Sequence, residues 1–393
     1  MHVLDQPDAA SFPVVDHKAD AAIYVHWPFC AKKCPYCDFN SHVRDRVDQR
    51  SWRDGMLREI ETFAEKFPNL TATSVFFGGG TPSLMPPDTT AAIIDAIKDH
   101  WSPASDIEIT LEANPSSVEA ARFAEYASAG VNRVSVGIQS LKDSSLKFLG
   151  RLHSSKEALS ALEVARDNFS RVSFDLIYAL PHQSLEDWRE ELQEALSFSP
   201  SHLSLYQLTI EEGTAFYHQF HRGKFTLPDE DEAAALFELT QKVTEAAGLP
   251  AYEVSNHARP GEESQHNLTY WRGGFYAGIG PGAHGRLPNG NWGLIAHQQV
   301  KRPEDWLNAV KNRGFGIETV EEVDAEAEAI ERIMMGLRLS RGMDIGNYEG
   351  TNINAAVLND LIVSGYMERL GSRVWLTDKG RPLLNFILGK LLA

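Results

Sequence analysis

The chain's three cysteines, Cys30, Cys34 and Cys37, all lie in the stretch YVHWPFCAKKCPYCDFNSH, and none occurs elsewhere in the 393 residues. A disulfide framework usually spreads many cysteines along a short secreted chain, so this clustering favours metal or redox chemistry in a reducing compartment. Three thiolates can hold three irons of a four-iron cluster and leave the fourth iron open to another ligand. The spacing C-x3-C-x2-C therefore favours a [4Fe-4S] cluster.

Zinc is the competing metal. A structural zinc ion takes four ligands, commonly as two spaced pairs, and this chain has no second pair of cysteines. His26 or His42 could supply the fourth ligand, so a zinc site stays open as an alternative.

Six short runs rich in β-branched and aromatic residues alternate with longer stretches whose apolar residues have helical spacing. The runs are residues 21–27, 73–78, 106–113, 132–138, 171–180 and 201–209. This alternation predicts a parallel sheet in which five helices link six strands. A closed eight-unit barrel typically needs about 250 residues, whereas these units end near residue 209. The sequence therefore predicts an α/β fold with an incomplete (β/α)6 barrel.

Polar residues follow the predicted strands at the ends where parallel barrels place their chemistry. The cysteine loop follows the first run, and GGGTPS, residues 78–83, follows the second. Glu112 and Gln139 end the third and fourth runs, Asp175 lies in the fifth, and Arg151 precedes it. We therefore expect these residues to form one site.

Each residue type suits a particular ligand group. The glycines 78–80 let a ligand or a neighbouring chain approach the backbone. Glu112 lies in an apolar strand and should meet a cation, either a substrate amine or a structural partner such as a lysine. Arg151 suits a carboxylate, and Gln139 and Asp175 could bond ribose hydroxyls. Together they would complement an amino acid joined to a nucleoside.

The triplet C-x3-C-x2-C after a first strand, followed by GGGTP, resembles the radical S-adenosylmethionine (SAM) enzymes. Over about residues 20–390 the chain is similar to the oxygen-independent coproporphyrinogen III oxidase-like family, especially its heme chaperone branch. The resemblance implies a [4Fe-4S] cluster on Cys30, Cys34 and Cys37, with its open iron chelated by the amine and carboxylate of SAM. A one-electron reductant would then allow cleavage of SAM to methionine and a 5′-deoxyadenosyl radical that abstracts hydrogen.

The same resemblance implies which residues surround SAM. Glu112 would contact the amine, Arg151 the carboxylate, and Gln139 with Asp175 the ribose. The other residues that the resemblance places there are Tyr24, Gly79, Gly80 and Thr81.

One position separates the branches of this family. The oxidases of the family carry the pattern C-x3-C-x2-C-x-C, with a further cysteine two residues after the third. In this chain Phe39 stands at that position, and the extension before residue 21 is short. Both departures favour the heme chaperones, which implies heme as cargo and an acceptor hemoprotein, such as one of a respiratory chain. The alternative is an oxygen-independent coproporphyrinogen III dehydrogenase, which decarboxylates two propionates to vinyl groups.

A second motif, HNLTYW, begins at His266 and resembles the HNxxYW motif associated with heme binding in the chaperones. From the residues alone, His266 could ligate heme iron, and Tyr270 and Trp271 offer flat apolar surface to a porphyrin. The histidine could equally be a hydrogen-bonded core residue, and His257 and His284 are rival ligands.

Residues 325–393 are predicted as three helices and a hairpin, a winged-helix-like α+β domain. From residue 326 onward this part has eight acidic and eight basic residues, so it lacks the basic footprint of a DNA reader. A zinc-dependent winged-helix regulator is therefore disfavoured, and a lid or partner-docking role over the barrel's open side is preferred. The net charge of the chain, −17, also argues against nucleic acid as a partner.

The predicted organisation is an N-terminal extension (1–20), a partial barrel (21–210), a connector with the heme-binding segment (211–324) and the C-terminal domain (325–393). No apolar run approaches the roughly 20 residues of a membrane helix. The N-terminus carries acids where a signal peptide would be basic and then apolar. We expect a cytoplasmic protein, at most peripherally attached to the inner face of a membrane.

Overall fold

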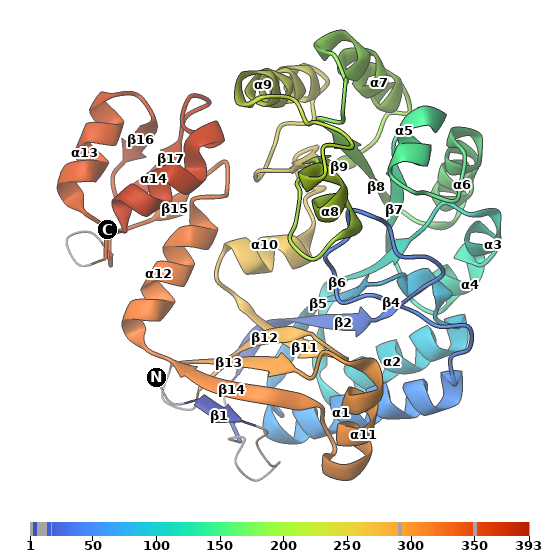
Figure 1. The fold of residues 1–393 in the computed structure, drawn as a ribbon. Helices are drawn as coiled ribbons and strands as arrows, with labels where there is room; N and C mark the ends of the chain where they lie inside the picture. The colour runs from blue at the N-terminus through green and yellow to red at the C-terminus, as the bar shows by residue number, and fades with distance from the viewer. Residues whose placement is uncertain (1–2, 6–13, 17, 290–292, 349–351, 393) are drawn as a thin grey trace.

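A curved sheet, with six parallel strands at its centre, organises the computed structural model, which describes residues 3–5, 14–16, 18–289, 293–348 and 352–392 (Figure 1). The six strands are β2 (Ala19–Trp27), β5 (Leu70–Gly79), β6 (Ser102–Ala113), β7 (Arg133–Gln139), β8 (Arg171–Tyr178) and β9 (His202–Gln207). Neighbours in this order pair in parallel, and each predicted run overlaps one strand. The incomplete six-unit barrel is confirmed.

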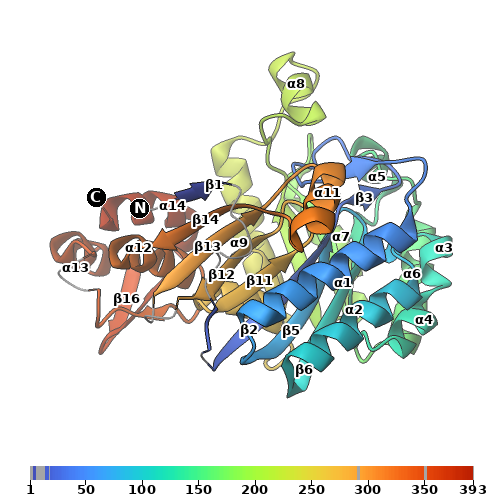
Figure 2. The same cartoon turned by 90° about the horizontal axis from the view of Figure 1, so that it is seen from below.

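Helices link these strands and cover the outer face of the sheet (Figure 2). They are α1 (Gln49–Lys66), α2 (Pro87–His100), α3 (Ser117–Ala120), α4 (Phe123–Ser128), α5 (Asp143–Phe148), α6 (Ser155–Asn168) and α7 (Leu185–Ser197). The prediction of one helix per connection holds for three of the five. The connections after β6 and β7 each contain two helices. Ser154 and Ser184 begin α6 and α7 with capping boxes, which satisfy backbone N–H groups of the first turn.

The sheet continues on both sides of the six strands. The further elements are α8 (Ala215–His221), α9 (Glu230–Ala246), β10 (Asn256–Ala258), α10 (Gln265–Trp271), β11 (Phe275–Ile279), β12 (His284–Pro288), β13 (Leu294–Gln299), α11 (Pro303–Arg313), β14 (Ile317–Val323) and β1 (Val3–Asp5). β10 pairs antiparallel with β9. β11 pairs parallel with β2, and β12, β13, β14 and β1 follow it as antiparallel neighbours. The segment 211–324, expected as a connector, thus supplies strands to the barrel sheet.

The C-terminal residues form a smaller α+β unit that α12 joins to the barrel (Figure 1). Its elements are α12 (Ala325–Gly336), β15 (Met343–Asp344), α13 (Ala355–Val363), β16 (Met367–Leu370), β17 (Arg373–Leu376) and α14 (Leu384–Leu391). In the described residues two helices precede the β16–β17 hairpin, not the predicted three, and α14 follows it. Ile333, Val374 and Leu388 belong to an apolar core distinct from that of the barrel.

The barrel core is built around large aromatic side chains. Trp27, Phe77 and Trp188 are almost completely buried, and each such side chain contributes about 1.5–3 kcal/mol by leaving water. Trp52 of α1 stacks on Trp306 of α11 with ring centroids 5.2 Å apart, which fixes the extra strands against the barrel helices. No helix in the described part of the chain is long and apolar enough to cross a membrane.

Candidate cofactor site

The cysteine loop runs between the short parallel strands β3 (Phe29–Cys30) and β4 (His42–Val43), beyond the carboxyl end of β2. All three cysteines are free and partly buried. The backbone N–H of Cys37 donates to the carbonyl of Cys34 at 3.2 Å, which turns the loop between them. Burial raises the pKa of the Cys30 and Cys37 thiols, and a bound metal cation would favour their deprotonated forms.

Two thiols have polar partners from distant strand ends. The Thr81 hydroxyl donates to Cys30 Sγ at 3.4 Å, and Arg151 Nη1 donates to Cys34 Sγ at the same distance. Asn114 ties these partners together, because its Nδ2 donates to Thr81 Oγ1 at 3.3 Å and its Oδ1 accepts from Arg151 Nη2 at 2.7 Å. No sequence pattern singles out Asn114, although it follows the third strand in the same TLEANP stretch as Glu112.

The two histidines considered as zinc ligands are engaged elsewhere. The His26 ring bonds the Tyr24 hydroxyl at 3.0 Å and the Asn40 carbonyl at 2.9 Å, while His42 Nε2 bonds Asn40 Oδ1 at 3.0 Å. No three His, Cys, Asp or Glu side chains among the described residues are placed to hold one metal ion. A single zinc ion needs all its ligands within about 2.3 Å, whereas a four-iron cluster binds each thiolate at a different iron. The arrangement therefore gives the zinc alternative no support.

The glycine loop packs directly against the start of the cysteine loop. Gly80 N–H donates to the Trp27 carbonyl at 2.7 Å, and Thr81 N–H donates to the Phe29 carbonyl at 2.9 Å. Gly79 has φ +108°, a conformation that side chains disfavour. These hydrogen bonds hold the glycine loop against the end of β2 and the start of the cysteine loop. The glycines therefore position the cysteine loop and also leave room for a ligand.

Replacing Gly80 with alanine is expected to destabilise the protein by about 1–3 kcal/mol, the usual cost of overpacking. An added Cβ would lie 2.8 Å from the carbonyl oxygen of Phe29 and the carbonyl carbon of Pro28, and neither backbone atom can rotate away. Chemical unfolding of the iron-free protein measures this. Gly389→Ala is the control, because nothing lies within 4 Å of its added Cβ. Equal unfolding free energies for the two variants would show that the close approach is not needed.

Two carboxylates lie inside the barrel near these loops. Glu112 on β6 is partly buried, and burial together with the nearby Asp175 raises its pKa to about 8. Burial also raises the pKa of Asp175 to about 6, although it accepts a hydrogen bond from the Ser135 hydroxyl at 3.2 Å. The nearby Arg133 and Arg171 both face Glu108, at 4.0 and 2.5 Å. Within the described residues Glu112 has no lysine or arginine partner within 4.0 Å, so the expected structural partner is not found.

Gln139 and Arg151 also reach this region. Gln139 ends β7 with φ +73°, an uncommon backbone conformation for a residue with a side chain, beside an irregularity in the β7–β8 pairing. Arg151 Nη2 also donates to the Gly137 carbonyl at 2.8 Å, while its buried Nε has no partner among the described residues. The Glu112 carboxylate accepts a hydrogen bond from the Gly79 backbone but has no cationic partner among the described residues. This carboxylate and the unpaired N–H of Arg151 fit the amine and carboxylate of an amino acid.

His266, in contrast, is a buried residue with both ring nitrogens engaged. It is 1% exposed, with Nδ1 2.9 Å from the Ser74 hydroxyl and Nε2 2.6 Å from the Tyr270 hydroxyl. Burial lowers its pKa to about 3, so the ring is neutral. His257 is also fully buried, on β10. In this conformation neither histidine lines the cavity beside α10.

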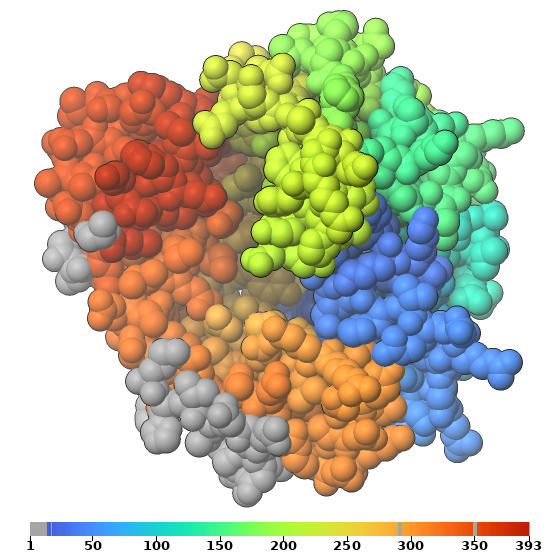
Figure 3. Space-filling model, viewed as in Figure 1, coloured from blue at the N-terminus to red at the C-terminus, as the bar shows by residue number. Residues whose placement is uncertain are grey.

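That cavity, of about 460 Å³, lies where the face drawn in Figure 3 is hollowed between the red C-terminal unit and the orange strands. Tyr24 and Glu112 line it from the strand ends. Tyr270 and Trp271 of α10 and the exposed His284 of β12 line it from the other side. Three of the eight residues expected around SAM, Tyr24, Gly79 and Glu112, thus share one cavity with the aromatic pair of HNLTYW. The other five, Gly80, Thr81, Gln139, Arg151 and Asp175, are not among its lining residues.

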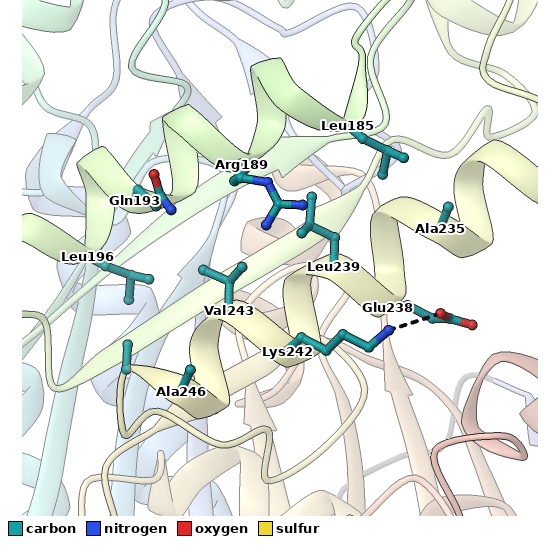
Figure 4. Close-up of a pocket in the computed structure, with 11 residues that line it drawn as sticks. Leu185, Arg189, Gln193, Leu196, Ala235, Glu238, Leu239, Lys242, Val243 and Ala246 are labelled. Carbon is teal, nitrogen blue, oxygen red and sulfur yellow. Dashed lines mark ion pairs between the residues drawn. The ribbon is translucent and has the colours of Figure 1, made fainter.

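A larger depression, of about 640 Å³, lies outside the barrel between α7 and α9 (Figure 4). Leu185, Leu196 and Leu239 contribute to its lining, and Lys242 pairs with Glu238 at its rim. It contains none of the residues expected to do chemistry, so its size does not make it the cofactor site.

The fold and this arrangement of loops define a radical SAM protein. A family profile described as the radical SAM superfamily matches residues 24–195, and one described as the HemN C-terminal domain matches residues 323–383. Over 379 residues the chain is 35% identical to the heme chaperone HemW of Escherichia coli K12, covering 95% of this chain and 98% of that protein. The chain belongs to the HemW family of radical SAM proteins.

Two further similarities extend this comparison. The mouse mitochondrial radical S-adenosyl methionine domain-containing protein 1 is 44% identical over 328 residues, 82% of this chain and 74% of that protein. The structure of coproporphyrinogen III oxidase (HemN) from Escherichia coli matches with a TM-score of 0.81 at 20% identity, covering 98% of this chain and 92% of that one. The second likeness shows a shared fold. Membership of the superfamily implies a [4Fe-4S] cluster and SAM.

Proposed function

We propose that this protein is a heme chaperone that binds a [4Fe-4S] cluster, SAM and heme, and passes the heme to an acceptor hemoprotein. One observation carries the proposal: three residues proposed to contact SAM, Tyr24, Gly79 and Glu112, line the same cavity as the aromatic residues of α10 and His284. The relative from Escherichia coli that covers nearly the whole chain is named a heme chaperone. A cavity of this composition suits a flat apolar ligand with a few polar groups.

Cys30, Cys34 and Cys37 are the proposed cluster ligands. Each sits in the loop whose geometry the glycine loop and Arg151 fix, so the three thiols arrive from one short segment on a rigid support. When reduced, the cluster would supply one electron to SAM. A one-electron reductant is therefore a required partner.

SAM is proposed to bind between the glycine loop and the inner carboxylates. Glu112 would pair with its amine, and Arg151 with its carboxylate through the unpartnered Nε. Gln139 and Asp175 would bond the ribose. The other proposed contacts are Tyr24, Gly79, Gly80 and Thr81.

Two histidines compete as the axial ligand of heme. His284 is exposed at the cavity, whereas His266, the residue that the HNLTYW motif indicates, is held by Ser74 and Tyr270. Ligation by His266 requires Nε2 to exchange its hydrogen bond with Tyr270 for the iron. His284 needs no such exchange, so we favour it in the described conformation.

The oxidase alternative would use the same cofactors on a porphyrinogen. Phe39 stands at the position where the oxidases carry a further cysteine. Its side chain is 59% exposed and lines the cavity. Phenylalanine can neither ligate metal nor transfer a proton, so this wall lacks the chemistry that a thiol would add. The side chain instead extends the apolar surface offered to a planar cargo.

The proposed organisation keeps residues 21–210 as the cofactor barrel and 325–393 as a lid or docking unit. The proposed acceptor is a hemoprotein, such as one of a respiratory chain. We propose a cytoplasmic location, with at most peripheral contact with a membrane.

The deciding experiment is anaerobic reconstitution with iron and sulfide, followed by incubation with SAM, a reductant and either heme or coproporphyrinogen III. The protein should bind heme with a distinct Soret band and should not form protoporphyrinogen IX. His284→Ala should shift or bleach the Soret band because it removes the axial ligand. Formation of protoporphyrinogen IX would establish the oxidase instead.

His266→Ala is the matched variant for the ligand assignment, with thermal unfolding as a check that the fold survives. A changed Soret band in this variant alone would move the ligand to His266 and require α10 to rearrange. Unaltered spectra in both variants would exclude both histidines while leaving heme binding intact.

A further inference from the structure

Two arginine–glutamate pairs line the cavity between β12 and α12. Arg286 Nε lies 3.0 and 3.1 Å from the two carboxylate oxygens of Glu331, and Arg332 Nε donates to Glu328 Oε1 at 2.8 Å. All four side chains line the cavity and are 24–33% exposed. Ion pairs with this much solvent access add little stability, so a competing anion can replace one partner.

Neither guanidinium is saturated by its carboxylate. Among the described residues, the only other acceptor of Arg286 besides Glu331 is the Gly285 carbonyl, to which Nη1 donates at 3.1 Å. Each guanidinium carries five N–H donors, so further donors of Arg286 are available to a second acceptor. The cavity-lining Trp271 also has a buried Nε1 with no acceptor among the described residues. The wall therefore carries N–H donors that the described residues leave without an acceptor.

The surface between these donors is aromatic. Tyr270 and Tyr276 meet edge to face, with centroids 4.6 Å apart, and Trp271 has Arg338 above its ring at 5.7 Å. His284 lies two residues before Arg286 on β12, and residues two apart on a strand point to the same face. A flat ligand whose metal faces His284 would thus have Arg286 near its edge.

Resting on the function proposed above, we propose that Arg286 and Arg332 bind the two propionate carboxylates of a porphyrin, which displace Glu331 and Glu328. Exchange of one carboxylate for another leaves each arginine paired, so neither partly exposed cation loses its partner. The released glutamates belong to α12 and retain access to solvent.

The exchange would change the contact between the two units, because only one of the two ion pairs connects them. Arg332 and Glu328 share α12, but Arg286 and Glu331 connect the barrel sheet to the helix that begins the C-terminal unit. Binding of the second propionate would therefore remove a contact between the two units. The carboxylates that pair with the two arginines are thus the groups that the cargo would replace.

The test is titration of the reconstituted protein with heme and with heme dimethyl ester, in which both propionates are esterified. Wild-type protein should bind heme about tenfold to a hundredfold more tightly than the ester, the range expected for charge-assisted hydrogen bonds. Arg286→Gln and Arg332→Gln should each reduce this preference and leave affinity for the ester unchanged. Glu331→Gln should tighten heme binding, because it weakens the competitor.

Arg189→Gln is the matched control, since Arg189 pairs with Glu186 on the outer helix α7, away from the cavity. Equal affinities of the wild type for heme and the ester would overturn carboxylate recognition while leaving heme binding intact. Equal losses for both ligands in the arginine variants would show that the arginines only maintain the fold. Absence of binding to both ligands would overturn this inference together with the proposed function.

Discussion

Cys30→Ala, Cys34→Ala and Cys37→Ala are each expected to abolish the four-iron cluster after anaerobic reconstitution. The chain has no other cysteine, so no neighbouring thiol can replace a lost ligand. Each thiolate would hold a different iron, and removing one would leave a second iron open beside the position meant for SAM. The measurement is iron and sulfide content together with the visible absorbance of the purified variants.

Ser41→Ala is the control for this series. Its hydroxyl lies 3.7 Å from Cys37 Sγ, so it changes the surroundings of a thiol without removing a ligand. This variant should retain the full iron content. A cysteine variant that keeps the wild-type iron content and spectrum would refute the ligand assignment.

Affinity for SAM is expected to fall about fiftyfold when the pH is lowered from 8 to 6. Glu112 has a pKa of about 8 in the free site because burial and Asp175 disfavour its charge. Pairing with the ammonium group of SAM requires the carboxylate, so binding below pH 8 must release one proton. The dissociation constant then rises up to tenfold for each pH unit lost. Equilibrium binding over this range measures the slope.

Glu112→Gln should remove most of this dependence and weaken SAM binding at pH 8. The same substitution should stabilise the protein in the absence of SAM. A carboxyl whose pKa is raised on folding contributes stability below its unfolded value near 4.5, and that contribution is lost as the pH rises through about 8. The amide variant avoids this loss, so at pH 8 it should unfold at a higher temperature than wild type. A wild-type SAM affinity that does not change with pH would refute the pairing.

The six central strands could be predicted because each is a short run of β-branched and aromatic residues at regular spacing. The added strands could not, because β10 has only three residues and β11 contains small residues such as Ala277 and Gly278. Their partners are also remote in sequence, as in the pairing of Ala277 with Ile23. Periodicity carries no information about such pairings.

Within the site, the residue types indicated which ligand groups could be bound, but they did not indicate which residues contact each other. The sequence leaves two partners open for Glu112, a substrate amine or a structural cation. The arginines nearby, Arg133 and Arg171, face Glu108 instead, a pairing that no sequence pattern indicates. The bond between Arg151 and Cys34 joins residues 117 positions apart, and no local pattern indicates it. His266 lies in a conspicuous motif, yet the motif does not indicate its contacts. The short helix α10 turns this histidine towards Ser74, where it forms buried hydrogen bonds.

Asn40 connects the cysteine loop to a segment of the chain that is remote in sequence. Its Nδ2 donates to the carbonyls of Pro281 and Lys301 at 2.9 and 2.8 Å, so a single amide clamps the cysteine loop to the turn that precedes His284. An added Cβ on Gly282 would lie 2.4 Å from that same nitrogen, so the clamp is tight. A shift of the cysteine loop would therefore be transmitted through this one side chain to the wall of the cavity that carries His284.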